Sequence, residues 1–398
     1  MSLDLTKVAG QVMAMIAALR DGRAEREKRL RFALDTLGNE AIDLDDLKKK
    51  IEVGRTTWLV ANIVEGLNKR YPLPPSPSDF TVLAADGSHI DVDRHQSTRC
   101  YLINIGSVVI SYGRRPGAVL LSSPRLYSEE KDLAITPPGG GREQTVEGTI
   151  LGVKRSVEEC YRLAVMAADL PPGSAALALL DGTLILWGLE AYPDFVTDAL
   201  LHDGLLPCLD AIKKLNKDRR LALASYISFP RSTDVVNVLR VAVCPDDVPD
   251  CDKLCPPGKQ RDCDTLAGVR DRDLFMALLE DGERSALFIS PSKVVREHYG
   301  THRVYFFYLR VGDEIARIEV PQWVAENKGL LDLTHSLVFD QSRRGHGYPV
   351  ALSEAHEQAV VTAADRENFR ELVESTLIEE HLPAPSSGKS ASKRTRWI

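Results

Sequence analysis

The sequence predicts an α/β protein in which a mixed β-sheet is flanked by helices and preceded by a helical segment. Three observations lead to this fold class. Residues 4–70 show apolar positions at helical spacing with few turn signals. Three strand-like runs follow, at 79–86, 99–112 and 116–123. A helical stretch at 143–169 then separates them from a fourth strand-like run.

Composition excludes several classes of protein. The chain has 398 residues, of which 44% are hydrophobic and 27% are charged, so it can bury a large core. A formal net charge of −7 means that any binding of nucleic acid must use a local basic patch. The N-terminus lacks the pattern of a signal peptide, and the apolar runs are too short to cross a membrane. We therefore expect a cytoplasmic protein with no membrane contact.

The N-terminal segment reads as two or three helices that end before YPLPPSPSD at 71–79. This Pro- and Ser-rich run marks a boundary. We expect a helical segment at 1–75 and a second domain at 76–382. The last residues, 383–398, are rich in Pro, Ser and basic residues, and we expect them to form a disordered tail.

The strands at 99–112 and 116–123 are joined by the turn-rich YGRRPG, so the first three strands form an antiparallel meander. The helix at 143–169 ends at LPPGS, before the fourth strand at 176–187. Such a crossover is long enough to return the fourth strand parallel to the first.

Two strands carry an Asp-Gly pair, AADGS at 84–88 and LLDGT at 179–183. An ionised carboxylate is costly to bury in an apolar strand unless it has a partner. Parallel neighbouring strands would bring Asp86 and Asp181 to one sheet edge, where they repel each other unless a cation lies between them. Oxygen ligands of this kind suit Mg²⁺ or Mn²⁺. The alternative for either pair alone is an ordinary turn.

Four cysteines are crowded in the loop-like segment 244–263: Cys244, Cys251, Cys255 and Cys263. They could hold a structural Zn²⁺ or an iron–sulfur cluster, although their spacing lacks the paired CxxC of a zinc ribbon. Unrelated free thiols are the equally weighted alternative. The other three cysteines lie in apolar periodic segments and are expected in the core: Cys100, Cys160 and Cys208.

Six short motifs, in this order and spacing, resemble those of one nuclease family: AADGS (84–88), RSVEE (155–159), LLDGTLILW (179–187), SYISFPRS (225–232), RDRDLF (270–275) and HGYPVALSEAHEQA (346–359). Over about residues 78–380 the chain resembles the NurA nucleases, which process DNA ends and have an RNase H-like fold similar to the Piwi domain. The resemblance therefore implies an α/β, RNase H-like (Piwi-like) mixed sheet. The cysteine segment would be an insertion in this domain.

The resemblance also implies the catalytic residues: Asp86, Glu159, Asp181, Tyr348 and His356. All of them except Tyr348 are the expected ligands of Mn²⁺ or Mg²⁺, and His356 could instead move a proton. The helix acid is less defined by sequence alone. The spacing from Arg155 favours Glu159, Glu158 is the second choice, and Glu147 is the third.

The motif that contains Arg231 and Ser232 lies between an expected strand and an expected helix. A helix start with a guanidinium beside it could bind a phosphate of DNA. The alternative is an N-cap serine followed by a surface arginine.

The two Asp-Gly sites favour a divalent-metal-dependent enzyme, and the resemblance implies a DNA nuclease, an exonuclease and single-strand endonuclease in double-strand-break repair. The resemblance implies a homodimer that works with a hexameric ATPase of the HerA type. The chain contains no GxxxxGK[ST] motif, so ATP-driven motion would come from that partner. The alternative is an inactive subunit that binds DNA or the ATPase. Intact acids at both Asp-Gly sites favour the enzyme.

Overall fold

The computed structural model describes residues 4–91, 99–256, 258 and 261–382, so the predicted tail lies outside the described residues. The chain divides into two compact units. Unit 1 comprises residues 1–73, 228–292 and 306–317, and unit 2 comprises 74–227, 293–305 and 318–398. No helix among the described residues is long and apolar enough to span a membrane.

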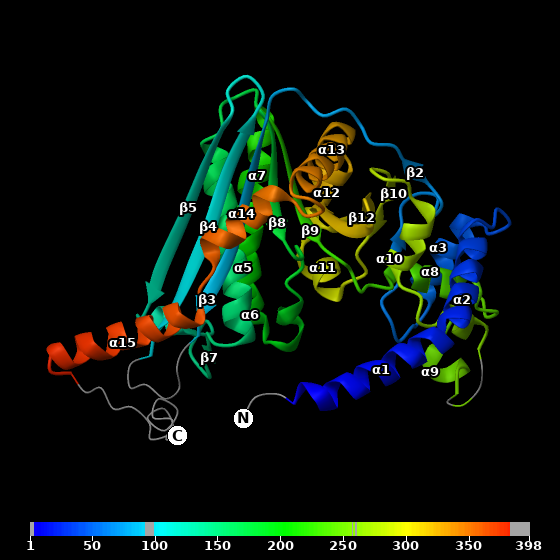
Figure 1. Cartoon of the computed structure of the whole chain (residues 1–398), viewed down its shortest axis with the longest axis horizontal. Helices are drawn as coiled ribbons and strands as arrows, with labels where there is room; N and C mark the ends of the chain where they lie inside the picture. Colours follow the sequence, from blue (N-terminus) through cyan, green and yellow to red (C-terminus); the bar gives the residue numbers. More distant parts are fainter. Residues whose placement is uncertain (1–3, 92–98, 257, 259–260, 383–398) are drawn as a thin grey trace. The chain divides into compact units, whose positions relative to one another are not determined.

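Unit 2 contains the RNase H-like sheet (Figure 1). Its strands are β3 (Phe80–Ile90), β4 (Tyr101–Tyr112), β5 (Gly117–Tyr127), β8 (Ala175–Asp181) and β9 (Arg220–Ile227), with two short strands, β6 (Ala134–Ile135) and β7 (Gln144–Thr145), paired apart from them. The spatial order is β9-β8-β3-β4-β5. The predicted meander β3-β4-β5 is antiparallel, and β8 runs parallel to both β3 and β9. The fold class and the parallel return of the fourth strand are therefore confirmed.

The helices of unit 2 are α4 (Glu130–Leu133), α5 (Thr149–Ala168), α6 (Asp194–Thr197), α7 (Leu206–Lys214), α11 (Lys293–His298), α12 (Gln322–Ala325), α13 (Lys328–Arg344), α14 (Val350–Ala359) and α15 (Ala363–Glu379). A π-helix, Asp198–Leu205, leads into α7. Helices α5 and α14 both contact β3 and β4. The large core cluster lies among α5, the sheet and α7, and it includes Cys160 and Cys208 as predicted.

Unit 1 combines three N-terminal helices with later segments of the chain. Its helices are α1 (Leu5–Asp21), α2 (Arg23–Leu37), α3 (Leu44–Val53), α8 (Asp234–Ala242), α9 (Cys251–Leu254) and α10 (Asp271–Leu278). Its short strands are β1 (Asn62–Ile63), β2 (Arg70–Tyr71), β10 (Arg284–Ser285) and β11 (Phe288–Ile289). The strands β12 (Val304–Val311) and β13 (Glu314–Pro321) are divided between the two units.

The structure differs from the sequence-based expectation in one place here. Residues 54–70 are not helical, because the chain after α3 forms the short strands β1 and β2. Residues 228–292 pack with the N-terminal helices in unit 1. Leu37 and Leu47 share one buried cluster with Val238 and Phe275, so burial of apolar surface joins these distant segments.

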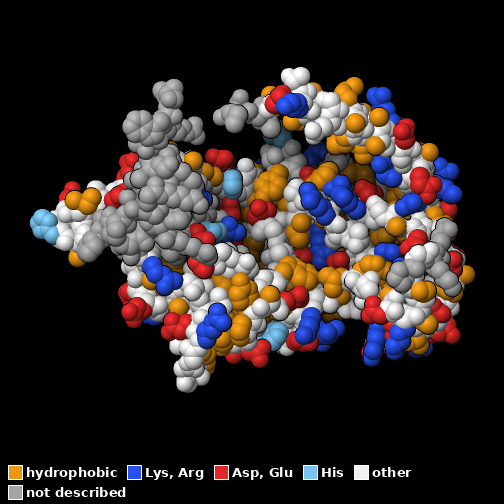
Figure 2. Space-filling view, turned by 90° about the horizontal axis from the view of Figure 1, so that it is seen from below, with side chains coloured by type: hydrophobic (Ala, Val, Ile, Leu, Met, Phe, Trp, Pro, Cys, Tyr) orange, Lys and Arg blue, Asp and Glu red, His pale blue; other side chains and the backbone are white. Residues whose placement is uncertain are grey.

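The charged surface is mixed in sign, as the composition predicts. Figure 2 shows Lys and Arg side chains interspersed with Asp and Glu on the right-hand side of the view. Among the side chains drawn there, no single sign dominates. Attraction between this face and a polyanion is therefore local.

Candidate active site

The register of two parallel strands brings Asp86 and Asp181 together. Pairing of β3 with β8 ends at Ala85 and Leu180, and the next residue of each strand is the aspartate. The predicted meeting of the two Asp-Gly sites at one edge is thus confirmed. Two details were wrong: β3 continues past Asp86 to Ile90, still paired with β4, and β8 ends at Asp181 rather than at 187. Gly182 has φ of +84°, which ends the extended conformation.

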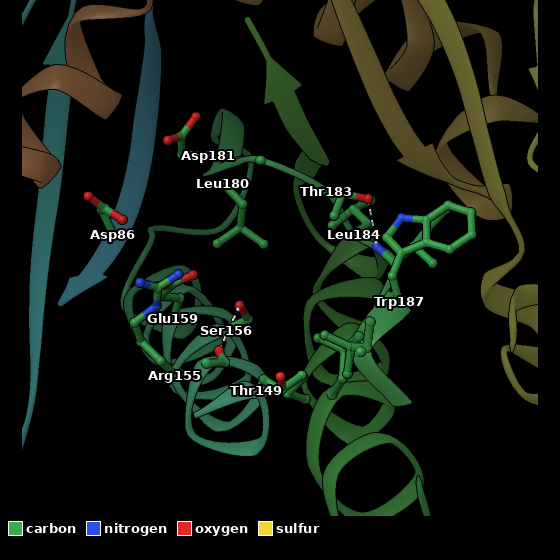
Figure 3. Close-up of a pocket in the computed structure, with 17 residues that line it drawn as sticks. Asp86, Thr149, Arg155, Ser156, Glu159, Leu180, Asp181, Thr183, Leu184 and Trp187 are labelled. Atoms are coloured by element: carbon green, nitrogen blue, oxygen red, sulfur yellow. Dashed lines mark hydrogen bonds and ion pairs between the residues drawn. The ribbon is translucent and has the colours of Figure 1, made fainter. Parts of the chain in front are cut away.

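Glu159 approaches this edge from α5. Figure 3 shows Asp86, Glu159 and Asp181 around one cavity, each from a different element. The helix lies close to β3 at Gly87, where a Cβ atom would sit 2.7 Å from Oε1 of Glu159 and 2.8 Å from Cγ of Arg155. Only glycine leaves room for this approach, so the Asp-Gly pair serves packing as well as chemistry.

Arg155 stands one turn before Glu159 and lies beside its carboxylate. The Nε of Arg155 is 3.1 Å from Oε1 of Glu159, a charge contact that lacks hydrogen-bond geometry. The Glu159 side chain is almost fully buried, with 7% exposed. Sequence reasoning used Arg155 only as a spacing marker and missed this pairing, although the i,i+4 spacing of opposite charges is a signal for it.

Two of these carboxylates, Glu159 and Asp181, have a raised pKa, mainly because they are buried. Burial raises the pKa of Glu159 to about 8, and the negative charges of Asp86 and Asp181 act in the same direction, against the opposing charge of Arg155. The pKa of Asp181 is also raised, first by loss of surrounding water and then by the charge of Asp86. This cavity therefore favours a bound cation or proton.

His356 reaches the same edge from α14. Its Nδ1 lies 2.7 Å from Oδ2 of Asp86. Helix α14 comes this close because Gly106, the strand partner of Asp86 on β4, has no side chain: a Cβ there would sit 2.1 Å from the carbonyl oxygen of Ala355. Partners across an antiparallel pair point to the same face, so Asp86 faces α14, whereas Gly87 faces α5.

Tyr348 lies in the turn between α13 and α14, beside Asp181. Its hydroxyl donates a hydrogen bond to the Asp181 carboxylate, and burial followed by this negative charge raises the pKa of the phenol. The ring meets Tyr226 of β9 edge-on, with centroids 5.5 Å apart. Tyr348 therefore stays protonated and orients Asp181.

The structure separates the three candidates for the helix acid. Glu159 lines the cavity, whereas Glu158 accepts a hydrogen bond of 3.0 Å from the Tyr127 hydroxyl. Glu147 precedes α5 and is absent from the residues that line the cavity. Of the three, only Glu159 shares the cavity with both aspartates.

Comparison with known proteins gives the family of the chain. The model of the NurA domain matches residues 80–361, which is most of the chain and spans every residue of the candidate site. This chain belongs to the NurA family. NurA proteins are nucleases of DNA end processing. A search of curated proteins finds no significant match to the chain.

The carboxylates of this NurA site are oxygen donors of the kind that a divalent ion needs. Three carboxylates line one cavity, and burial together with neighbouring negative charge raises the pKa of Glu159 and Asp181, which matches the chemistry of a site for a hard cation. Among the described residues, however, no three His, Cys, Asp or Glu side chains are grouped closely enough to hold an ion. Asp86 faces α14 and Glu159 comes from α5, so a shared ion would require their side chains to turn toward each other.

The predicted phosphate site of this NurA chain lies in unit 1. Ser232 Oγ is 2.8 Å from the hydroxyl of Tyr308. At the start of α8 the buried carboxylate of Asp271 accepts hydrogen bonds from the backbone N–H groups of Val235 and Val236, so these two groups already have an anionic partner. Arg231 is exposed. Sequence reasoning missed Asp271, whose position as a remote helix cap has no local signal.

The four clustered cysteines also lie in unit 1, and all are free thiols. Burial raises the pKa of Cys251, and the charges of Cys255, Cys263 and Cys244 add to the effect, so the four side chains are near one another. Among the described residues, these four cysteine side chains are not arranged closely enough to hold a metal ion. A structural Zn²⁺ or iron–sulfur cluster at Cys244, Cys251, Cys255 and Cys263 stays a prediction.

Proposed function

We propose that this NurA-family chain is a divalent-metal-dependent DNA nuclease. The observation that supports the proposal most strongly is the single cavity that Asp86, Glu159 and Asp181 all line. Burial and the charge of Asp86 raise the pKa of Glu159 and of Asp181, so ionising these two side chains is costly unless a cation offsets their charge, and their presence in one cavity favours a catalytic role.

Mn²⁺ or Mg²⁺ would be held by Asp86, Glu159 and Asp181. A divalent ion in such a site makes a bound water more acidic and neutralises charge on the leaving oxygen of a phosphodiester. Arg155 would lose part of its contact with Glu159 when that carboxylate turns to the ion, and its guanidinium could then face a phosphate.

His356 is suited to move a proton. Its Nδ1 is directed at Asp86, which leaves Nε2 to face solvent or substrate, and the side chain is 59% exposed. In this orientation a hydrogen bond between Nδ1–H and Asp86 would hold the ring so that Nε2 exchanges a proton with water or the leaving oxygen. Tyr348 would keep Asp181 oriented through its hydrogen bond.

The wider proposal follows the family. We infer exonuclease and single-strand endonuclease activity in double-strand-break repair, in a cytoplasmic homodimer that receives DNA from a hexameric ATPase of the HerA type. The absence of a GxxxxGK[ST] motif from the sequence supports a separate motor protein.

The test is degradation of linear DNA by the purified chain with Mn²⁺ or Mg²⁺. Asp86→Asn and Asp181→Asn should each lower the rate by at least about 100-fold, because one carboxylate is lost from a site that needs all three. Both variants should keep the circular dichroism spectrum of the wild type. Asp169→Asn at the exposed end of α5 is the matched control and should keep full activity.

Full activity in either active-site variant would refute the proposal. A wild-type chain that binds DNA but cuts none with either ion would instead favour the inactive binding subunit.

A further inference from the structure

The cavity that the acids line has a volume of about 510 Å³ and extends away from them between α5 and the segment after β8. One side is a stripe of α5, in which Thr149, Gly152, Val153 and Ser156 lie at helical spacing before Glu159. The other side is the segment after β8, from Leu184 to Gly188. Figure 3 shows the acids at one end of this pocket and Trp187 at the other. Its volume is in the range of pockets that hold one small ligand.

The wall after β8 offers apolar surface but no spare backbone donors at its centre. The N–H of Leu184 donates to Glu319, and the N–H of Leu186 donates to the hydroxyl of Tyr299. The N–H of Ile185 donates to Thr183 Oγ1. A phosphate would find no free amide along this wall, so the wall suits an apolar, flat group.

The α5 side leaves space for such a group. Gly152 has no atom within 4 Å of the position of an added Cβ, so the helix surface is open there. The hydroxyl of Ser156 donates a hydrogen bond to the carbonyl of Gly152 at 3.3 Å, so its oxygen can still accept a hydrogen bond from a ligand. The pocket thus combines aliphatic walls with a hydroxyl acceptor, which matches the faces and the N–H edges of a nucleobase.

We propose that this pocket binds one unpaired nucleobase of DNA, next to the phosphate that the acids would hold. The inference rests on the proposed nuclease function for the position of the phosphate. A paired base lies in the stack of a duplex and cannot enter the pocket until it is unpaired.

Binding of short DNA tests the pocket without cleavage. The protein is the full chain with Asp181→Asn, and the probes are a fluorescent single strand, the same length of abasic strand, and a duplex. Adding Gly152→Leu should weaken binding of the normal strand by at least about tenfold, the scale of one lost base contact. Binding of the abasic strand should change by less than about threefold, because it has no base to displace.

Ala168→Leu adds the same side chain at an exposed position of α5 and should change neither affinity. Gly152→Ala adds only a methyl group into open space, keeps the helix, and should give a smaller loss in the same direction. Equal weakening of normal and abasic strands by Gly152→Leu, or no weakening in either glycine variant, would overturn the base pocket.

Cleavage by the chain with Asp181 intact separates the two proposals. If that chain cuts no DNA but the binding pattern holds, the nuclease proposal fails and the base pocket stands. If it cuts single strands and Gly152→Leu leaves both binding and cutting unchanged, the nuclease proposal stands and the base pocket fails.

Discussion

Glu159 carries the largest electrostatic cost in the site. Its pKa is raised to about 8, mainly by burial, so the folded chain holds a proton that the unfolded chain releases near the ordinary value of 4.5. Below pH 4.5 the side chain is protonated in both states and has no effect on stability. Between that pH and about 8 the free energy of unfolding falls as pH rises, and above 8 the loss is complete.

We therefore expect Glu159→Gln to stabilise the metal-free protein at high pH. The difference from wild type should grow between pH 5 and 9 by a few kcal/mol at most, since each pKa unit corresponds to about 1.4 kcal/mol. Urea unfolding in the presence of a chelator measures it. Glu357→Gln, at an exposed glutamate of α14, is the control and should follow wild type. A pH-independent difference would show that Glu159 is not the group that titrates.

At the scale of elements, two close approaches build the site. Helix α5 meets β3 at Gly87, and helix α14 meets β4 at Gly106. Each contact places one functional side chain, Glu159 from α5 and His356 from α14, at the strand that carries Asp86. The pairing of β3 with β8 brings the two aspartates together, and the two helix contacts add Glu159 and His356.

Gly106→Ala should therefore destabilise the protein and disturb the site together. The new methyl group would collide with the backbone of α14, at 2.1 Å from Ala355 O and 2.5 Å from Ala359 N, and backbone cannot turn aside as a side chain can. We expect a loss of about 2–4 kcal/mol in the free energy of unfolding, measured by urea denaturation.

Gly152→Ala is the matched control, because the same substitution on α5 meets open space. It should leave stability unchanged or raise it by about 0.5–1 kcal/mol, as alanine favours a helix. An equal loss in the free energy of unfolding in both variants would mean that Gly106 is needed for its backbone conformation and not for its contact with α14.

At the scale of the whole molecule, the expected partners decide how the site is used. We predict a dimer in sedimentation at micromolar concentration. We also predict that a HerA-type ATPase raises the rate of duplex degradation by at least about tenfold in an ATP-dependent manner, since duplex must be opened before a strand reaches the acids. The rate on a single strand should rise less. A monomeric chain whose rate of duplex degradation does not change on addition of the ATPase and ATP would contradict both predictions.

The sequence by itself determined the fold class, the parallel return of β8 beside β3, and the pairing of Asp86 with Asp181. These features depend on local periodicity and on turn residues, which can be read from the sequence, and on general rules for crossover connections. The motifs of the NurA family added His356 and Tyr348. Sequence reasoning failed where it extended a strand through Gly182 and a helical segment through residues 54–70.

Only the tertiary structure decided which glutamate joins the aspartates, how His356 is held, and which segments form unit 1. Glu158 and Glu159 are neighbours with the same propensities, and their roles separate only because α5 lies with Glu159 against Gly87. Asp86 and His356 are 270 residues apart, and Asp271 caps α8 from 36 residues beyond Val235. Periodicity reports which face of an element is buried, but the partner of that face depends on packing between distant segments.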